Sequence, residues 1–245
     1  MDLLAASRLI EKPLLSCIWD FDDQDIISCP PVFKSDIEPG CGFWAAVRDT
    51  LPSPTASVLA KMSLVDSVMA FRRLQHMENT SFDNLMRARF TIHHSILALP
   101  RWDELSENAK LSYEYSMYET VRLAATLYST AIIWAMPPHT GWHLLVLQQL
   151  HKHVHHLDLW QLSRTQLDLL IWSVMLASII AYLTEWRDFY LHRLLDALVA
   201  RDCHDLSTVL EIVTRMAWSM SACMQGAEVV WVAIEPRVLA KTSST

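Results

Sequence analysis

The sequence predicts an all-α protein, a single-domain bundle of about seven helices preceded by an irregular, proline-rich N-terminal arm. Four glycines in 245 residues are too few for the tight turns of a many-stranded sheet protein. Apolar residues recur with the helical period over long stretches, and prolines separate these stretches. Hydrophobic residues make up 52% of the chain and charged residues 19%, which excludes an intrinsically disordered protein.

The start of the chain differs in composition from the rest. Residues 1–55 hold Pro13, Pro30, Pro31, Pro39, Pro52 and Pro54, together with two of the four glycines. We therefore expect an irregular arm over residues 1–55 that packs on the body and includes a short helix at 2–10. The helical domain is then expected over residues 56–236, followed by a flexible tail at 237–245.

The first helix of this domain is predicted over residues 57–77, where Val58, Met62, Val65 and Met69 form an apolar stripe on one face. The other helices are predicted at 81–99, 112–136, 141–156, 166–202 (two helices broken near Thr184) and 207–234.

Prolines and capping residues set the helix boundaries. Pro100 stops the helix at 81–99, and Pro137-Pro138 ends the next one, because proline has no amide donor and disfavours helix in the residue before it. The candidate N-caps are Ser81, Thr140, Ser163 or Thr165, and Ser207.

The most hydrophobic segment is LLIWSVMLASIIAYLT at residues 169–184, bracketed by Asp168 and Glu185. It is slightly short for a membrane span, so it predicts a fully buried core helix and no membrane-spanning segment.

Charge and cysteine usage restrict the expected partners and compartment. The net charge is −7 and no basic run occurs, so we expect no direct nucleic-acid binding. The five cysteines are widely spaced with no CxxC pair, which indicates buried thiols in a reducing compartment. The N-terminus does not read as a signal peptide, so we expect an intracellular protein, cytoplasmic or nuclear.

Several short motifs occur in a particular order. They are Tyr118-Glu119 with Arg122 before an Ala-rich run, Pro137-Pro138 with Gly141, and Ala222-Cys223 with Gly226 and Trp231. With this order the chain resembles, over about residues 55–235, the fungal-specific transcription factor domain. The resemblance implies an all-helical regulatory region, which in that family follows a zinc binuclear-cluster DNA-binding module.

The chain departs from this family at identifiable places. No six-cysteine cluster and no basic linker precede the domain. The pair that is often Gly-Gly in the buried helix is Ala177-Ser178 here, and Met220 and Met224 stand at positions that are often acidic.

The resemblance implies a stand-alone regulatory module that binds an apolar small molecule or a protein partner and regulates secondary metabolism. A cofactor-free pathway enzyme on the same scaffold, a cyclase, isomerase or dehydratase acting on an apolar intermediate, remains the alternative. Neither the oligomeric state nor enzymatic activity is fixed by these patterns. We expect no cofactor, because no Gly-rich phosphate loop and no GxSxG or HExxH motif occurs.

Candidate site residues follow from the two hypotheses. An apolar cavity is expected beside the Tyr118-bearing helix, and its candidate ligand-binding residues are Trp134, Trp142, Trp172 and Met175. For the enzyme alternative the candidate catalytic residues are His94, Tyr118, Glu119, Arg122 and His139. A buried imidazole can act as a general base, and Glu119 with Arg122 at i and i+3 can serve as acid and electrostatic clamp.

A group of histidines is the densest chemical feature, and it comprises His139, His143, His151, His153, His155 and His156. His151 and His155 share a helix face, but His143 and His151 lie about 12 Å apart along a helix, too far for one metal ion. The group therefore predicts a solvated polar helix face and no metal site.

Overall fold

The computed structural model describes residues 41–75, 82–100, 113–137 and 141–242. Over these residues the protein has nine α-helices and no strand, which confirms the all-α prediction. The α-helices are α3 (Cys41–Thr50), α4 (Ser53–Gln75), α5 (Phe82–Leu97), α7 (Tyr113–Tyr128), α8 (Gly141–His155), α9 (Arg164–Ile180), α10 (Arg187–Arg201), α11 (Leu206–Thr214) and α12 (Met220–Thr242). A π-helix, η2 (Ser129–Ile133), follows α7, and a 3₁₀ turn, η3 (Leu159–Gln161), precedes α9.

The described residues form nine α-helices, more than the predicted number of about seven, for two reasons. First, α3 lies within the segment predicted as an irregular arm, where Trp44 and Val47 are buried one turn apart. Second, the helix predicted at 207–234 is divided into α11 and α12. The indole Nε1 of Trp172 donates a hydrogen bond to the Ala217 carbonyl at 2.9 Å, which holds the connecting segment in the core.

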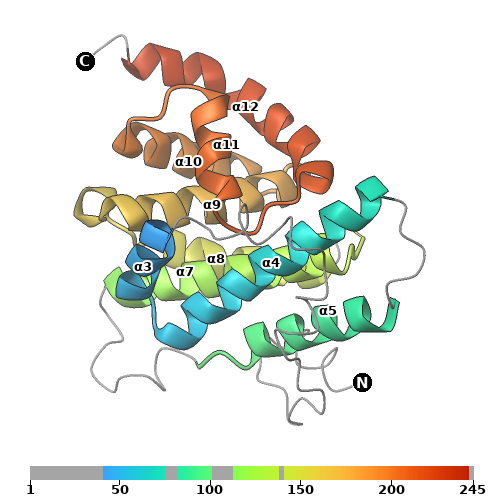
Figure 1. Cartoon of the computed structure of the whole chain (residues 1–245). Helices are drawn as coiled ribbons and strands as arrows, with labels where there is room; N and C mark the ends of the chain where they lie inside the picture. Colours follow the sequence, from blue (N-terminus) through green and yellow to red (C-terminus); the bar gives the residue numbers. More distant parts are fainter. Residues whose placement is uncertain (1–40, 76–81, 101–112, 138–140, 243–245) are drawn as a thin grey trace.

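Helix α9 is the centre of the fold, as its hydrophobic sequence predicts. Its residues from Leu167 to Ser178 are buried without exception. In Figure 1, α10, α11 and α12 lie on one side of α9, and α7 and α8 lie on the other, with α4 and α5 beyond them. Contacts of α9 with α3, α7, α10, α11 and α12 agree with this central position. In the part of the chain that the structure describes, no helix has the length and apolarity needed to cross a membrane.

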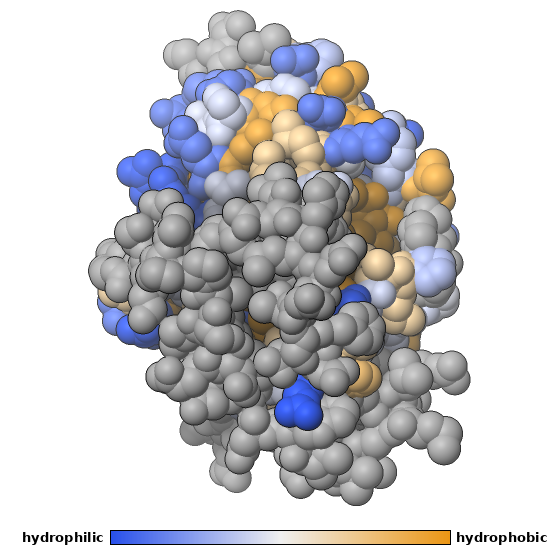
Figure 2. Space-filling model, turned by 45° about the vertical axis from the view of Figure 1, so that its right-hand side comes forward, coloured by the Kyte–Doolittle hydropathy of each residue, from blue (hydrophilic) through white to orange (hydrophobic). Residues whose placement is uncertain are grey.

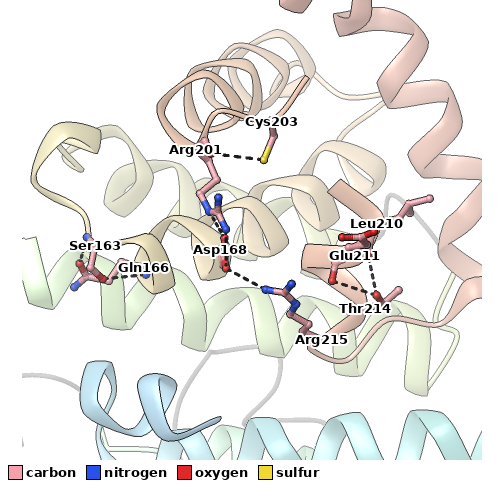
Figure 3. A network of polar contacts seen from close by, with 9 residues as sticks. All are labelled: Ser163, Gln166, Asp168, Arg201, Cys203, Leu210, Glu211, Thr214 and Arg215. Atoms are coloured by element: carbon pink, nitrogen blue, oxygen red, sulfur yellow. Dashed lines mark hydrogen bonds and ion pairs between the residues drawn. The ribbon is translucent and has the colours of Figure 1, made fainter. Parts of the chain in front are cut away.

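One buried carboxylate connects α9 to two other helices (Figure 3). Asp168 on α9 accepts a hydrogen bond from Arg201 Nε of α10 at 2.5 Å, and Arg215, which follows α11, lies 3.8 Å from its other oxygen. Asp168 is 4% exposed, so the two guanidinium groups compensate a charge that would otherwise be costly to bury.

The helix boundaries agree with the predicted signals in part. Ser163 caps α9 in a capping box with Gln166, and the predicted break near Thr184 separates α9 from α10. The N-cap of α11 is Asp205 and not Ser207, since the Asp205 side chain accepts from the Thr208 amide at 2.8 Å. The candidate caps Ser81 and Thr140, and the predicted helix at 2–10, lie outside the described residues.

The last helix continues further than the sequence pattern indicated. Helix α12 includes Pro236 and ends at Thr242, so most of the expected tail at 237–245 is helical. Cys203 and Cys223 are free and buried thiols, in agreement with the prediction for these two cysteines.

Candidate functional site

A pocket of about 580 Å³ opens where four helical segments meet. These are the π-helix η2 with the residues after it, the start of α8, the end of α9 and the first half of α12. The pocket is lined by Ala131, Ile132, Met136, His143, Ile179, Ile180, Tyr182, Leu183, Ala222, Gln225, Gly226 and Val229. Its volume falls within the range of about 300–1,000 Å³ that is typical of small-molecule sites.

Two apolar residues on the rim of the pocket are exposed. Leu183 and Val229 on its rim are 77% and 40% exposed. Figure 2 brings forward the side of the molecule on which α12 begins, and hydrophobic residues reach the surface there between hydrophilic ones. An apolar rim favours the entry of an apolar molecule.

The π-helix forms one wall of the pocket. The Trp134 amide donates to the Ser129 carbonyl at 2.9 Å and the Met136 amide to the Thr130 carbonyl at 3.0 Å, so the chain is wider here than in an α-helix. Ala135 then adopts φ 47°, a left-handed conformation that costs a non-glycine residue about 1 kcal/mol. A π-turn and a strained residue recur at functional sites; here η2 carries the lining residue Ile132, and Ala135 directly precedes the lining residue Met136.

Helix α5 holds the π-helix in place. The Arg89 guanidinium donates to the Ile133 carbonyl and lies over the Trp134 ring, 4.9 Å from its centroid. His93 Nδ1 lies 2.9 Å from Ser129 Oγ at the start of the π-helix. Burial, with a smaller contribution from His94, lowers the pKa of His93 to about 4. His93 is therefore a neutral hydrogen-bonding partner of Ser129 at neutral pH.

The opposite wall is a close contact of α9 with α12. Gly226 on α12 has no side chain, and Ile179 of α9 occupies the space that a Cβ atom would take. Ala222 lies one turn before Gly226, so small residues line this part of α12. At Gly226 this space is filled by Ile179, so α9 and α12 pack closely beside the pocket.

The polar groups of the lining are few. His143 in the first turn of α8 is fully buried, whereas Tyr182 is half-buried and Gln225 is exposed. The Tyr182 hydroxyl accepts from Arg187 Nη2 at 3.5 Å, and the Arg187 guanidinium lies over the Tyr182 ring at 4.5 Å. Among the described lining residues there is no carboxylate, lysine or arginine, so the pocket is suited to an uncharged apolar molecule.

The structure brings together two of the candidate catalytic residues, away from this pocket. Glu119 and Arg122 are 4% and 6% exposed, and Glu119 Oε2 accepts from Arg122 Nε at 2.9 Å and Nη2 at 2.7 Å. His153 of α8 lies near both, and its pKa is lowered by burial, an effect that the Glu119 charge opposes. The pair thus stabilises the buried contact of α7 with α8.

The other candidate catalytic residues are dispersed. The Tyr118 hydroxyl donates to the Pro100 carbonyl, and His94 is half-buried in the last turn of α5. His139 lies outside the described residues. Among the described residues, neither Tyr118 nor His94 lines the pocket.

The candidate ligand-binding residues are packed into the protein and do not line this pocket. Trp172 and Met175 are fully buried on α9, and Trp142 is buried on α8. Trp134 packs edge-on against Phe90 with ring centroids 4.6 Å apart.

Most residues that line the pocket carry no sequence signal, because alanine, isoleucine and valine in a helix are typical of any core. Two members carried a recognisable signal. His143 belongs to the histidine group, and Gly226 is a glycine inside a predicted helix, where it normally indicates a close approach of another element.

The remaining histidines form an aromatic contact with α10. The His151 and His155 rings are stacked with centroids 5.9 Å apart, and His151 also contacts Trp186 and Phe189 at 4.7 and 4.1 Å. Burial lowers the pKa of His151, and electrostatic repulsion from His155 lowers it further. Within the described residues, no three His, Cys, Asp or Glu side chains are grouped closely enough to hold a metal ion.

A second buried group of titratable side chains joins α4, α7 and α12. Asp66, Tyr128 and Cys223 are all buried. Burial and then the Asp66 charge raise the pKa of Tyr128 well above its usual value, and they raise the pKa of Cys223 to about 12. The phenol and the thiol are therefore protonated at neutral pH and are poor nucleophiles.

Comparison of the chain with protein-family models, with curated proteins and with solved structures finds no match. The resemblance to the fungal-specific transcription factor domain therefore stays a prediction from the sequence.

Proposed function

We propose that this protein is a helical module that binds an apolar small molecule in the pocket between η2, α8, α9 and α12. The observation that carries this proposal is the pocket itself, with a volume of about 580 Å³ and an aliphatic lining. A concave, mostly apolar pocket of this size with a few polar groups is typical of small-molecule sites, which favours a binding role.

The resemblance to a regulatory domain supports the same role. In this proposal the module responds to an apolar metabolite and acts on other proteins, as a stand-alone relative of the fungal-specific transcription factor domain. The net charge of −7 favours a module that does not itself bind duplex DNA.

Cofactor-free acid–base catalysis in the same pocket is the second candidate, and the half-buried Tyr182 in the lining is the observation in its favour. A positioned phenol can exchange a proton with a bound substrate. The two candidates differ in the fate of the ligand: a binding module returns it unchanged, whereas an enzyme converts it. Mass spectrometry of ligand recovered after incubation therefore separates them.

The binding proposal is tested with two matched variants of α12. Val229 lines the pocket, whereas Val232 is 69% exposed and does not line it. We expect Val229→Trp to fill the mouth and to weaken binding of the apolar fluorophore N-phenyl-1-naphthylamine at least about tenfold, since such sites bury most of a ligand's surface. Val232→Trp should leave binding within about twofold of the unmodified protein.

Two results would overturn the proposal. One is the absence of saturable fluorophore binding to the unmodified protein. The other is equal weakening by both tryptophan variants, which would place the fluorophore on the outer face of α12.

A further inference from the structure

We infer that the ligand of this pocket is an uncharged amphiphile, which inserts its apolar body into the pocket and keeps its polar end at the mouth beside the amide of Gln225. The inference rests on the proposed function, and it adds the class of ligand, its orientation and the side chain that meets its polar end.

Gln225 lies in the wall of the pocket that α12 provides. Ala222, Gln225, Gly226 and Val229 all line the pocket, and their spacing of three and four residues places them on one face of the helix. Alanine, glycine and valine offer no polar side-chain atom. Among these four residues Gln225 is therefore the polar point of an otherwise apolar wall.

Gln225 is accessible at the mouth of the pocket. It lines the pocket and is exposed, as are Ala222 and Val229 on the same face of α12. By contrast, the lining residue Ile180 of α9 is only 7% exposed. An elongated ligand loses the most apolar surface to the protein when its apolar body points toward Ile180 and its polar end stays beside Gln225.

The lining favours a polar end without charge. Among the described lining residues there is no carboxylate, lysine or arginine. An anionic or cationic end that enters the mouth therefore loses hydration and gains no partner of opposite charge in the lining. The Gln225 amide offers both a hydrogen-bond donor and an acceptor, which suits a hydroxyl or a carbonyl group.

The charges beside the rim add a second reason against an anionic end. The exposed Glu185 and Glu228 lie within two residues of the rim residues Leu183 and Val229. The Arg187 guanidinium on this side lies over an aromatic ring of the lining, 4.5 Å from its centroid. Two exposed carboxylates against one cation leave an excess of negative charge near the mouth, which repels a carboxylate.

The test uses three amphiphiles of the same chain length and the full-length protein. The neutral decan-2-one, the anion decanoate and the cation decylammonium each displace N-phenyl-1-naphthylamine, and their affinities follow from the displacement curves at neutral pH. We expect decan-2-one to bind the unmodified protein most tightly of the three.

Two matched variants test the orientation of the ligand. Gln225→Arg places a cation beside the expected polar end. Val232→Arg adds the same charge seven residues further along α12, about 10 Å away, outside the pocket lining and beyond the screening length at physiological salt. Circular dichroism and the melting temperature of each variant establish that it is folded.

The readout is the ratio of the affinity for decanoate to that for decan-2-one, because a change in the shape of the pocket affects both probes alike. We expect Gln225→Arg to raise this ratio about fivefold, as a charge pair near the surface does, and Val232→Arg to change it by less than about twofold.

A third variant tests the amide itself. Gln225→Leu removes the donor and the acceptor, so the affinity for decan-2-one relative to that for the fluorophore should fall about threefold, a modest change because water competes for this hydrogen bond. An unchanged ratio would show that the amide does not bind the polar end.

The outcomes separate this inference from the proposed function. If the fluorophore binds saturably but Gln225→Arg and Val232→Arg shift the ratio equally, the orientation is wrong while the pocket remains a binding site. Tighter binding of decanoate or decylammonium than of decan-2-one to the unmodified protein would overturn the uncharged class of ligand. If the fluorophore does not bind saturably, the proposed function itself fails.

Discussion

The backbone of Gly226 on α12 lies against Ile179 on α9 so closely that a Cβ atom on Gly226 would stand 2.5 Å from Ile179 Cγ2. Carbon atoms in contact are ordinarily about 3.5–4.0 Å apart, so even one methyl group cannot be added there without a shift of the Ile179 side chain or of the two helices. This contact fixes the spacing of the two helices beside the pocket.

We therefore expect Gly226→Ala to destabilise the protein, although alanine is the better helix former. Overpacking costs about 1–3 kcal/mol and the gain in helix propensity offsets about 1 kcal/mol of this, which leaves a net loss of about 1 kcal/mol in the free energy of unfolding. Gly141→Ala is the control, because nothing lies within 4 Å of its Cβ position. Chemical denaturation that shows equal effects of the two changes would contradict the close contact.

The buried ion pair of α7 yields a second prediction. Glu119→Gln leaves the Arg122 charge without its carboxylate partner, so we expect a loss of about 3 kcal/mol in the free energy of unfolding. The exposed Glu228→Gln serves as the control and should change stability by less than about 0.5 kcal/mol. Replacing both members, as Glu119→Gln with Arg122→Met, should recover part of the loss, and a further loss in the double variant would show that the two side chains act independently.

The third prediction concerns pH. The pKa of His93 is lowered from 6.5 to about 4, so the unfolded chain binds a proton first as the pH falls. The contribution of neutral His93 to the free energy of unfolding is fully present above about pH 6.5. It decreases as the pH falls from 6.5 toward 4 and is constant below that. Between pH 7 and 5 we expect a loss of about 2 kcal/mol from His93.

His93→Phe should flatten this part of the pH profile, and the exposed His156→Gln should not. The measurement is the free energy of unfolding in urea at half-unit pH steps. A profile of His93→Phe that runs parallel to that of the unmodified protein would show that His93 titrates normally in the folded state.

The fourth prediction concerns the buried thiols. Because burial raises the pKa of Cys223 to about 12 and also raises that of Cys203, both should resist alkylation by iodoacetamide at pH 8 in the folded protein. Both should react fully in urea. Peptide mass mapping distinguishes them from the other three cysteines, and rapid native labelling of Cys223 would contradict its position in the core.

Much of the fold was predictable because the deciding signals are local. The hydrophobic run around Trp172 predicts a buried helix, and Ser163 marks the start of that helix by its capping box. The division between α11 and α12 was not predictable, because it depends on the hydrogen bond from Trp172 to the Ala217 carbonyl, a contact between distant parts of the chain.

The candidate site was predicted much less well. Ionisable and aromatic residues such as Glu119 and Trp172 are natural candidates for a functional site in a sequence. In the structure Glu119 instead pairs with Arg122, and Trp172 donates to the Ala217 carbonyl. The pocket lies where four helical segments meet, and the widening of α7 into a π-helix depends on contacts from Arg89 and His93 of α5. The pattern of residue types along the chain does not indicate where a pocket forms between helices.

The central claim is that an apolar ligand occupies the pocket between η2, α8, α9 and α12. A crystal structure of the full chain grown with a bromine-labelled decan-2-one tests it most directly, because the anomalous signal of bromine locates the ligand. The account predicts bromine between α9 and α12, near Ile179 and Val229. Bromine on the protein surface, or side chains that fill the pocket in a structure with no bound ligand, would contradict it.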